Sequence, residues 1–182
     1  MGRTKSRREV IAETLNRMNI SVDKFGHCGV KLPESAWNNE TFFKQYKFYL
    51  AFENSLCDEY VTEKLYRGLN SSQHFGLIPI VYGGANYSSM LPNQSYVNVD
   101  DFTDIATLVQ YLHKLKQAES HLIESFYQWH LNWHVSDLEM FRHLNGWQTL
   151  CKNIWNYGSK DENVNFLKNI ESLLGKCYLP HI

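Results

Sequence analysis

The sequence predicts an α/β domain in which parallel strands alternate with crossover helices. Residues 46–53 are almost all aromatic or aliphatic, a composition typical of a strand buried on both faces of a sheet. An acidic turn follows, after which apolar residues recur at helical spacing. The same change from strand to helix recurs between 78–82 and 105–115. Such alternation favours a parallel sheet with helices packed on its faces.

Composition limits the class of protein. The chain has 182 residues, enough for one domain or for one large piece of a two-domain protein, and 43% of them are hydrophobic. A net charge of −1 gives no global field that would favour a nucleic-acid partner. No apolar run is long enough for a transmembrane segment, and the basic N-terminus is not followed by the apolar region of a signal peptide.

The cysteines and the N-glycosylation sequons concern the cellular compartment. Four cysteines allow three pairings, of which we expect Cys28–Cys57 and Cys151–Cys177 in an oxidising compartment. Five N-x-S/T sequons favour the secretory pathway, although an Asn-rich sequence also produces such sites by chance. The sequon asparagines are Asn19, Asn39, Asn70, Asn86 and Asn93.

The N-terminal part begins with a helix predicted over 4–18, because apolar residues there form one stripe. A cluster of arginines and Lys5 crowds the start of this helix, where positive charge opposes the helix dipole. Either these side chains are simply solvated, or one arginine faces an anion. A short strand over 22–26 and a polar loop to about residue 45 follow.

The central strand, 46–53, leads into a helix predicted from about residue 59 with Asp58 as its N-cap. Ligands of open α/β sheets bind at the carboxyl ends of strands, which is where this turn lies. Four polar residues would share one face of the helix and could form a site for a phosphorylated sugar donor. They are Tyr60, Glu63, Lys64 and Arg67.

The remaining elements follow the same alternation. Residues 70–74 contain poor helix formers and predict a frayed helix end. Gly83 and Gly84 would let the backbone turn beside a ligand, and Asp100 and Asp101 are expected to cap the next helix. The other predicted elements are strands over 78–82 and 96–99 and helices over 105–115, 118–131, 138–157 and 162–174.

The run YKFYLAFENSLCDEYVTEK, residues 46–64, resembles the signature segment of α1,3-fucosyltransferases, the GDP-fucose-dependent glycosyltransferase family 10. The resemblance covers roughly residues 6–133 and continues through IPIVYG at 78–83 and VNVDDF at 97–102. It implies the Rossmann-like C-terminal domain of a glycosyltransferase of the type called GT-B. Residues 1–135 would then be the GDP-fucose-binding domain, lacking its first strand, and 136–182 a helical C-terminal extension.

The resemblance also implies an activity. Family members transfer L-fucose from GDP-fucose, with inversion, in α1,3 linkage to N-acetylglucosamine of glycoprotein glycans. The implied acceptor is an N-glycan or a glycolipid, and the implied location is the Golgi membrane with a lumenal catalytic domain. Two alternatives stay open: a non-catalytic fragment that binds GDP or GDP-fucose, and an interaction domain that keeps the fold but not the site.

Donor-binding residues are likewise implied by the resemblance. Arg8, Asn54, Tyr60 and Lys64 would contact the donor diphosphate, and Glu63 would accept hydrogen bonds from the ribose hydroxyls. Without the resemblance, Glu63 and Lys64 would read as solvated surface residues of a helix. Arg67 either contacts the donor or pairs with Glu63. No carboxylate here matches the catalytic base, which is expected in an N-terminal acceptor domain.

A metal cofactor is not expected. The sequence has no Asp-x-Asp motif and no Cys-x-x-Cys motif. His130 and His134 are four residues apart, but no third ligand is near them in the sequence. Protein cations would therefore stabilise the departing diphosphate in place of a metal ion.

Overall fold

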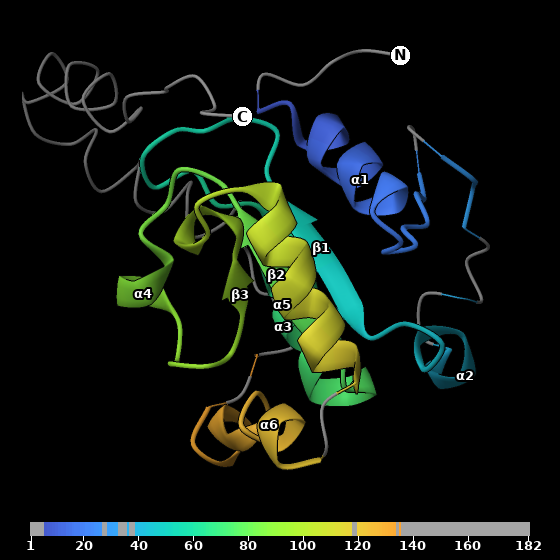
Figure 1. Cartoon of the computed structure of the whole chain (residues 1–182). Helices are drawn as coiled ribbons and strands as arrows, with labels where there is room; N and C mark the ends of the chain where they lie inside the picture. Colours follow the sequence, from blue (N-terminus) through green and yellow to red (C-terminus); the bar gives the residue numbers. More distant parts are fainter. Residues whose placement is uncertain are drawn as a thin grey trace, which may run out of the picture.

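The fold is built on a parallel sheet of three strands in the order β1-β2-β3 (Figure 1). The strands are β1 (Phe48–Phe52), β2 (Ile78–Tyr82) and β3 (Val97–Asn98). The structure is a computed structural model that describes residues 6–26, 29–32, 36, 39–117, 120–133 and 135. The α/β class predicted from the sequence is confirmed by this sheet and the helices that cover it.

Strand β2 lies at the centre of the described sheet, and all of its residues are buried. Its register with β1 places Ile78 opposite Phe48. Pro79, which has no N–H, lies one residue before β2 begins to pair with β3 at Ile80 and Val97. Proline is therefore tolerated here, because no ladder hydrogen bond to β3 is lost.

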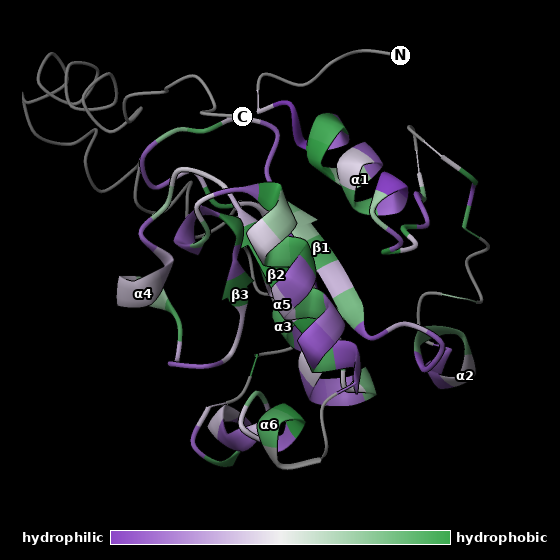
Figure 2. Cartoon of the chain, in the orientation of Figure 1, coloured by the Kyte–Doolittle hydropathy of each residue, from purple (hydrophilic) through white to green (hydrophobic). Residues whose placement is uncertain are grey.

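The two faces of the sheet are covered by different helices, because side chains alternate along each strand. Helix α3 (Glu63–Phe75) packs its Leu65 and Leu69 against Ala51 and Val81 on one face. Helices α1 (Arg8–Arg17) and α5 (Ile105–Gln117) cover the other face, where Ile11 and Leu112 join the core. Figure 2 shows the sheet as mainly hydrophobic between these two helical layers.

Helix α3 continues further toward its C-terminal end than predicted. Ser71 and Ser72 do not fray its end but lie buried within it, and the helix stops at Gly76, whose φ of 70° is left-handed. Small residues let the helix approach the sheet closely. A methyl group on Gly68 would lie 3.2 Å from a ring carbon of Tyr49.

Helix α1 begins later than predicted, at Arg8. The preceding Arg7 has a left-handed φ of 54°, which takes it out of the helix. Ser6 is held instead at the end of β1: its hydroxyl donates to the carbonyl of Glu53 at 2.7 Å, and its N–H donates to the carbonyl of Asn54 at 3.1 Å. These contacts to the strand end take the place of a first helical turn.

The strand predicted over 22–26 is not formed, and an isolated bridge between Phe25 and Val30 is the nearest equivalent. In the described part of the chain β1 is therefore an edge strand. Its first three residues are only half-buried, in contrast to the fully buried β2. Strand order depends on pairing between distant segments, which the apolar run alone does not encode.

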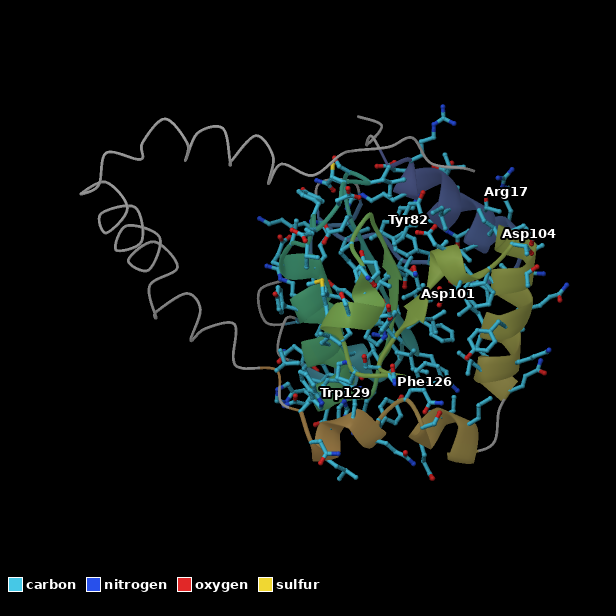
Figure 3. The ribbon with its side chains drawn as sticks, turned by 90° about the vertical axis from the view of Figure 1, so that its left-hand side faces the viewer. Arg17, Tyr82, Asp101, Asp104, Phe126 and Trp129 are labelled. Atoms are coloured by element: carbon cyan, nitrogen blue, oxygen red, sulfur yellow. The ribbon has the colours of Figure 1, made fainter. Side chains whose placement is uncertain are left out.

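The cap of α5 also differs from the prediction. Asp100 and Asp101 lie in a 3₁₀ turn after β3, and it is Asp104 whose carboxylate accepts from the N–H of Thr107 at 2.7 Å. Figure 3 shows Asp104 at the start of α5. The backbone N–H of Thr107 holds the pKa of the Asp104 carboxyl below its ordinary value.

The segment predicted as one helix over 118–131 is a short α6 (Ser120–Glu124) followed by a 3₁₀ helix, Gln128–Leu131. Phe126 and Trp129 are buried there against the end of the sheet (Figure 3). A short α2 (Glu40–Phe43) interrupts the loop predicted before β1. The two helices predicted beyond residue 136 lie outside the described residues. Among the helices described, none has the length and apolar character needed to cross a membrane.

Candidate functional site

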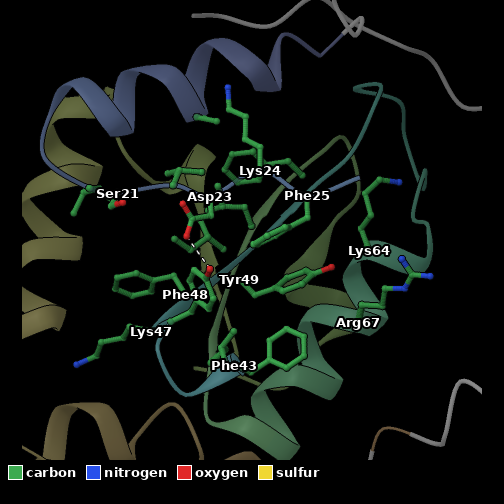
Figure 4. Close-up of a pocket in the computed structure, with 18 of the residues that line it drawn as sticks. Ser21, Asp23, Lys24, Phe25, Phe43, Lys47, Phe48, Tyr49, Lys64 and Arg67 are labelled. Carbon is green, nitrogen blue, oxygen red and sulfur yellow. Dashed lines mark hydrogen bonds between the residues drawn. The ribbon is translucent and has the colours of Figure 1, made fainter. Parts of the chain in front are cut away.

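A cavity of about 630 Å³ runs along β1 and reaches the carboxyl end of this strand. Charged residues from two helices line it there: Arg8 of α1, and Glu63, Lys64 and Arg67 of α3. Figure 4 shows Lys64 and Arg67 projecting from α3 beside Tyr49. The position agrees with the expectation that a ligand binds at the carboxyl end of a strand.

Arg8 reaches the site from the first turn of α1. Its Nη1 donates to the carbonyl of Phe52 at 2.8 Å, and its Nε lies 3.8 Å from the carboxylate of Glu9. One quarter of the Arg8 side chain is exposed. Because the Phe52 carbonyl occupies one amine group, the remaining guanidinium donors are fixed in direction beside the cavity.

The first turn of α3 differs from the prediction. The helix begins at Glu63 with Thr62 as its N-cap, so Asp58 is not the cap. Glu59 has a left-handed φ of 57°, which prevents the helix from starting there. Tyr60 consequently lies in the loop before α3, and the prediction that it shares a helix face with Glu63 and Lys64 is wrong.

A buried carboxylate at the end of β1 sets the start of α3. Glu53 is 1% exposed and accepts from the N–H of Thr62 at 2.8 Å and from the Thr62 hydroxyl at 2.7 Å. It thus occupies the end of the helix where an anion would otherwise bind. The signal available in the sequence was a lone acidic residue that ends an apolar strand.

The Lys64 side chain is held by Thr62 and lies between the carboxylates of Glu53 and Glu63. Its Nζ donates to the Thr62 hydroxyl at 2.9 Å and lies 3.6 Å from Glu53 and 3.4 Å from Glu63. Only 21% of the Lys64 side chain is exposed, which disfavours the reading as a solvated lysine. Partial burial opposes ionisation of Glu63, yet the Lys64 cation holds the pKa of this carboxyl below its ordinary value.

Arg67 lies one turn further along α3. Its positive charge contributes to the low pKa of Glu63. Burial raises the pKa of Tyr49, and the Arg67 cation partly opposes this shift. Arg67 therefore lies near Glu63, as expected if the two residues pair. It also lines the cavity, where it could contact a donor.

The structure brings three of the five predicted donor-binding residues, Arg8, Glu63 and Lys64, to one cavity. Asn54 and Tyr60 lie in the adjoining loop between β1 and α3, where the Tyr60 N–H donates to the carbonyl of Cys57 at 3.2 Å. Their contact with a donor stays a prediction.

Close packing explains the glycine pair after β2. A methyl group on Gly84 would lie 2.4 Å from the carbonyl oxygen of Cys57, and one on Gly83 would lie 2.4 Å from the hydroxyl of Tyr87. Cys57 itself is disulfide-bonded, and its partner lies outside the described residues. The predicted pairing of Cys57 with Cys28 is therefore untested.

Replacing Gly84 with alanine is expected to destabilise the domain by about 1–3 kcal/mol, because the loop backbone must move to admit the new methyl group. Urea unfolding followed by circular dichroism measures this change. Met90→Ala, at a position 42% exposed on α4 (Tyr87–Met90), is the control and should change the free energy of unfolding by less than about 0.5 kcal/mol. Equal stability of Gly84→Ala and wild type would contradict the close approach of the two loops.

Metal ligands are not gathered in the described part of the chain, which holds no group of three or more His, Cys, Asp or Glu side chains suited to a metal ion. His134, considered with His130 as a possible ligand pair, lies outside the described residues.

Comparison with known proteins identifies the family. Residues 2–173 match the model described as glycosyltransferase family 10 (fucosyltransferase), C-terminal part. The chain belongs to glycosyltransferase family 10. Among its relatives are α-(1,3)-fucosyltransferase C of Drosophila melanogaster, 41% identical over 138 residues, and α-(1,3)-fucosyltransferase fut-6 of Caenorhabditis elegans, 35% identical over 145 residues. The matches cover 73% and 74% of this chain, but 30% and 35% of the relatives.

A further relative carries a different name. GDP-fucose protein O-fucosyltransferase 3 of Homo sapiens is 33% identical over 136 residues, which cover 69% of this chain and 27% of that protein. The chain therefore spans about a third of the length of its curated relatives.

Solved structures agree with the family and the fold. A crystal structure of an α1,3-fucosyltransferase matches with a TM-score of 0.53 and 27% identity, over 66% of this chain and 33% of the other. A structure of an α1,3-fucosyltransferase with GDP-fucose matches with a TM-score of 0.50 and 27% identity, over 66% and 34%. The predicted Rossmann-like GT-B fold is thus confirmed.

Proposed function

We propose that this family 10 chain is the donor-binding part of a fucosyltransferase that transfers L-fucose from GDP-fucose in α1,3 linkage to N-acetylglucosamine of glycoprotein glycans, with inversion. The observation that carries the proposal is the pair of cations, Arg8 and Lys64, which two different helices present to one cavity at the carboxyl end of β1.

The chemistry requires stabilisation of the departing diphosphate. Negative charge develops on the leaving group, and fixed cations in a partly water-excluded site stabilise it best. Lys64 and Arg8 would supply that charge, with Asn54 and Tyr60 as further donors. Glu63 keeps an ionised, half-exposed carboxylate that can accept hydrogen bonds from the ribose hydroxyls. No metal ion is needed in this scheme.

The catalytic base is assigned to another part of the protein. A general base must reach the acceptor hydroxyl within hydrogen-bond distance. Glu53, the most buried carboxylate at the site, is 1% exposed and already bonded to Thr62, so it is unsuited to that role. An acceptor domain outside this chain would provide the base, and the whole enzyme would act in the lumen of the Golgi as a membrane-anchored protein.

The acceptor has a second candidate. The similarity to GDP-fucose protein O-fucosyltransferase 3 favours a protein hydroxyl as an alternative to a glycan. Both reactions would use the same donor site, because this chain, which carries the proposed site, is similar to both kinds of relative. The residues that select the acceptor would thus lie outside this site.

The test is a transfer assay with GDP-fucose on the full-length protein and on the 182-residue chain alone, with an N-glycan, a glycolipid and a folded protein domain as acceptors. Mass spectrometry detects the added fucose. We expect turnover by the full-length protein on one acceptor class and none by the chain alone, because the proposed base lies in the acceptor domain. Robust turnover by the chain alone would show that the base lies within it.

A further inference from the structure

The mechanism proposed above leaves one buried charged group without a role. Glu53 stands at the end of β1, and its side chain is sealed from solvent. The only cation within ion-pair distance of it, among the described residues, is the Nζ of Lys64 at 3.6 Å. Burying a carboxylate is costly unless specific partners compensate it. The partners of Glu53 at this site therefore indicate what it does.

A continuous chain of hydrogen bonds joins this carboxylate to the lysine. The Lys64 Nζ donates to the Thr62 hydroxyl oxygen at 2.9 Å, and that hydroxyl donates its own proton to Glu53 at 2.7 Å. The Thr62 N–H donates to the other carboxylate oxygen at 2.8 Å and fixes the threonine from a second direction. The hydroxyl therefore donates toward the Glu53 carboxylate and accepts from the ammonium group of Lys64.

We infer that Glu53 and Thr62 are positioning residues that hold the Lys64 ammonium at the mouth of the cavity before the nucleotide arrives. The inference rests on the proposed function, in which Lys64 binds the diphosphate. A lysine side chain is long and flexible, and ordering it upon binding reduces affinity. Of the three ammonium protons, one is donated to Thr62 and a second to Glu63, which leaves the third for the ligand.

A purely structural role makes a different prediction. If Glu53 and Thr62 served only to form the N-terminal cap of α3, loss of the Thr62 hydroxyl would lower stability without changing the affinity of the folded protein for nucleotide. If Thr62 instead touched the ligand, its loss would weaken binding whether or not Lys64 were present. Positioning through Lys64 requires that the effect of Thr62 disappear once Lys64 is removed.

The experiment is a double-mutant cycle on the 182-residue chain, with GDP as the titrant in calorimetry. Thr62→Val removes the hydroxyl and keeps the shape, Thr62→Ser keeps the hydroxyl as the matched control, and Thr62→Ala replaces Thr62→Val should the latter not fold. We expect Thr62→Val to weaken GDP binding about threefold to tenfold, as for one lost hydrogen bond, and Thr62→Ser to bind within twofold of wild type. In a Lys64→Ala background, Thr62→Val should have no further effect.

A second measurement observes the ammonium directly. In the wild-type protein, a slowly exchanging ¹H–¹⁵N signal is expected from the Lys64 Nζ, and it should vanish in Thr62→Val and persist in Thr62→Ser. Normal GDP affinity in Thr62→Val would overturn the positioning role while leaving the proposed function intact. An undiminished effect of Thr62→Val in the Lys64→Ala background would overturn it as well. Wild-type protein that fails to bind GDP would reject the proposed function and the inference together.

Discussion

Replacing Lys64 with alanine is expected to weaken GDP binding by about tenfold to a hundredfold. A hydrogen bond to a charged partner contributes about 1.5–3 kcal/mol, and Lys64 is held at the carboxyl end of β1 by Thr62 and Glu53. Titration calorimetry at constant ionic strength measures the change. Circular dichroism would verify that both proteins are folded at the temperature used.

The matched control is Lys44→Ala. Lys44 is two-thirds exposed, pairs with Glu40 one turn away on the surface, and does not line the cavity. Its removal alters the net charge of the protein by the same amount as Lys64→Ala, so it reports any general electrostatic effect. Equal GDP affinity in wild type and Lys64→Ala would remove Lys64 from the site.

A form of the protein extended by its own residues upstream of residue 1 is expected to be more stable than the 182-residue chain. The reason lies in the outer edge of β1. Lys47 accepts from Ile78, and Glu53 donates to Tyr82, so every second residue of the strand faces β2. The alternate residues, Phe48 and Leu50, direct their backbone groups toward the cavity, and their backbones form no hydrogen bond among the described residues.

The cavity has the place and the lining that a further strand requires. Residues 21–25 run along its far side, opposite Phe48 and Tyr49 (Figure 4). Ser6 is fixed at the carboxyl end of β1, so a segment that precedes it can run parallel to β1 and end there. Pairing of such a segment with Phe48 and Leu50 would occupy the cavity along these residues and would leave its carboxyl end, lined by Arg8 and Lys64, open to the donor.

The expected gain is about 2 kcal/mol or more in the free energy of unfolding, from several backbone hydrogen bonds and the burial of half-exposed apolar side chains. Urea unfolding of both forms measures it, and hydrogen exchange reports the amide of Leu50. An extension of equal length made of glycine and serine is the control and should add no stability. Unchanged exchange at Leu50 in the extended form would place the upstream residues elsewhere.

Much of the fold follows from local patterns, and the errors arise where distant residues decide. Strands β1 and β2 were predicted from their apolar runs and α5 from its apolar stripe, and all three are observed. The absence of a strand over 22–26, where only a bridge at Phe25 forms, was not predicted, because strand pairing depends on segments far apart in the chain. Helix α3 starts at Glu63 because Thr62 is bonded to Glu53, nine residues earlier, and no cap pattern near residue 59 reveals this.

The candidate site, like the fold, was predicted only in part. Resemblance located Lys64 and Arg8, and the structure places both on one cavity. Helical spacing alone misplaced Tyr60, since its premise was a helix that begins four residues too early. The role of Glu53 at the start of α3 was not predicted, because a single acidic residue after an apolar strand has many explanations, and only its burial and its bonds to Thr62 reveal this role.

The most direct test of the proposed donor site is a crystal structure of the protein with GDP. We expect the diphosphate between Lys64 and Arg8 at the carboxyl end of β1, with oxygen atoms about 2.7–3.0 Å from the Lys64 Nζ and from a guanidinium nitrogen, and with the ribose beside Glu63. Thr62 should keep its bond to Glu53 in the complex. A nucleotide bound elsewhere, with Lys64 and Arg8 still turned to Glu53 and Phe52 and touching no phosphate, would contradict the assignment.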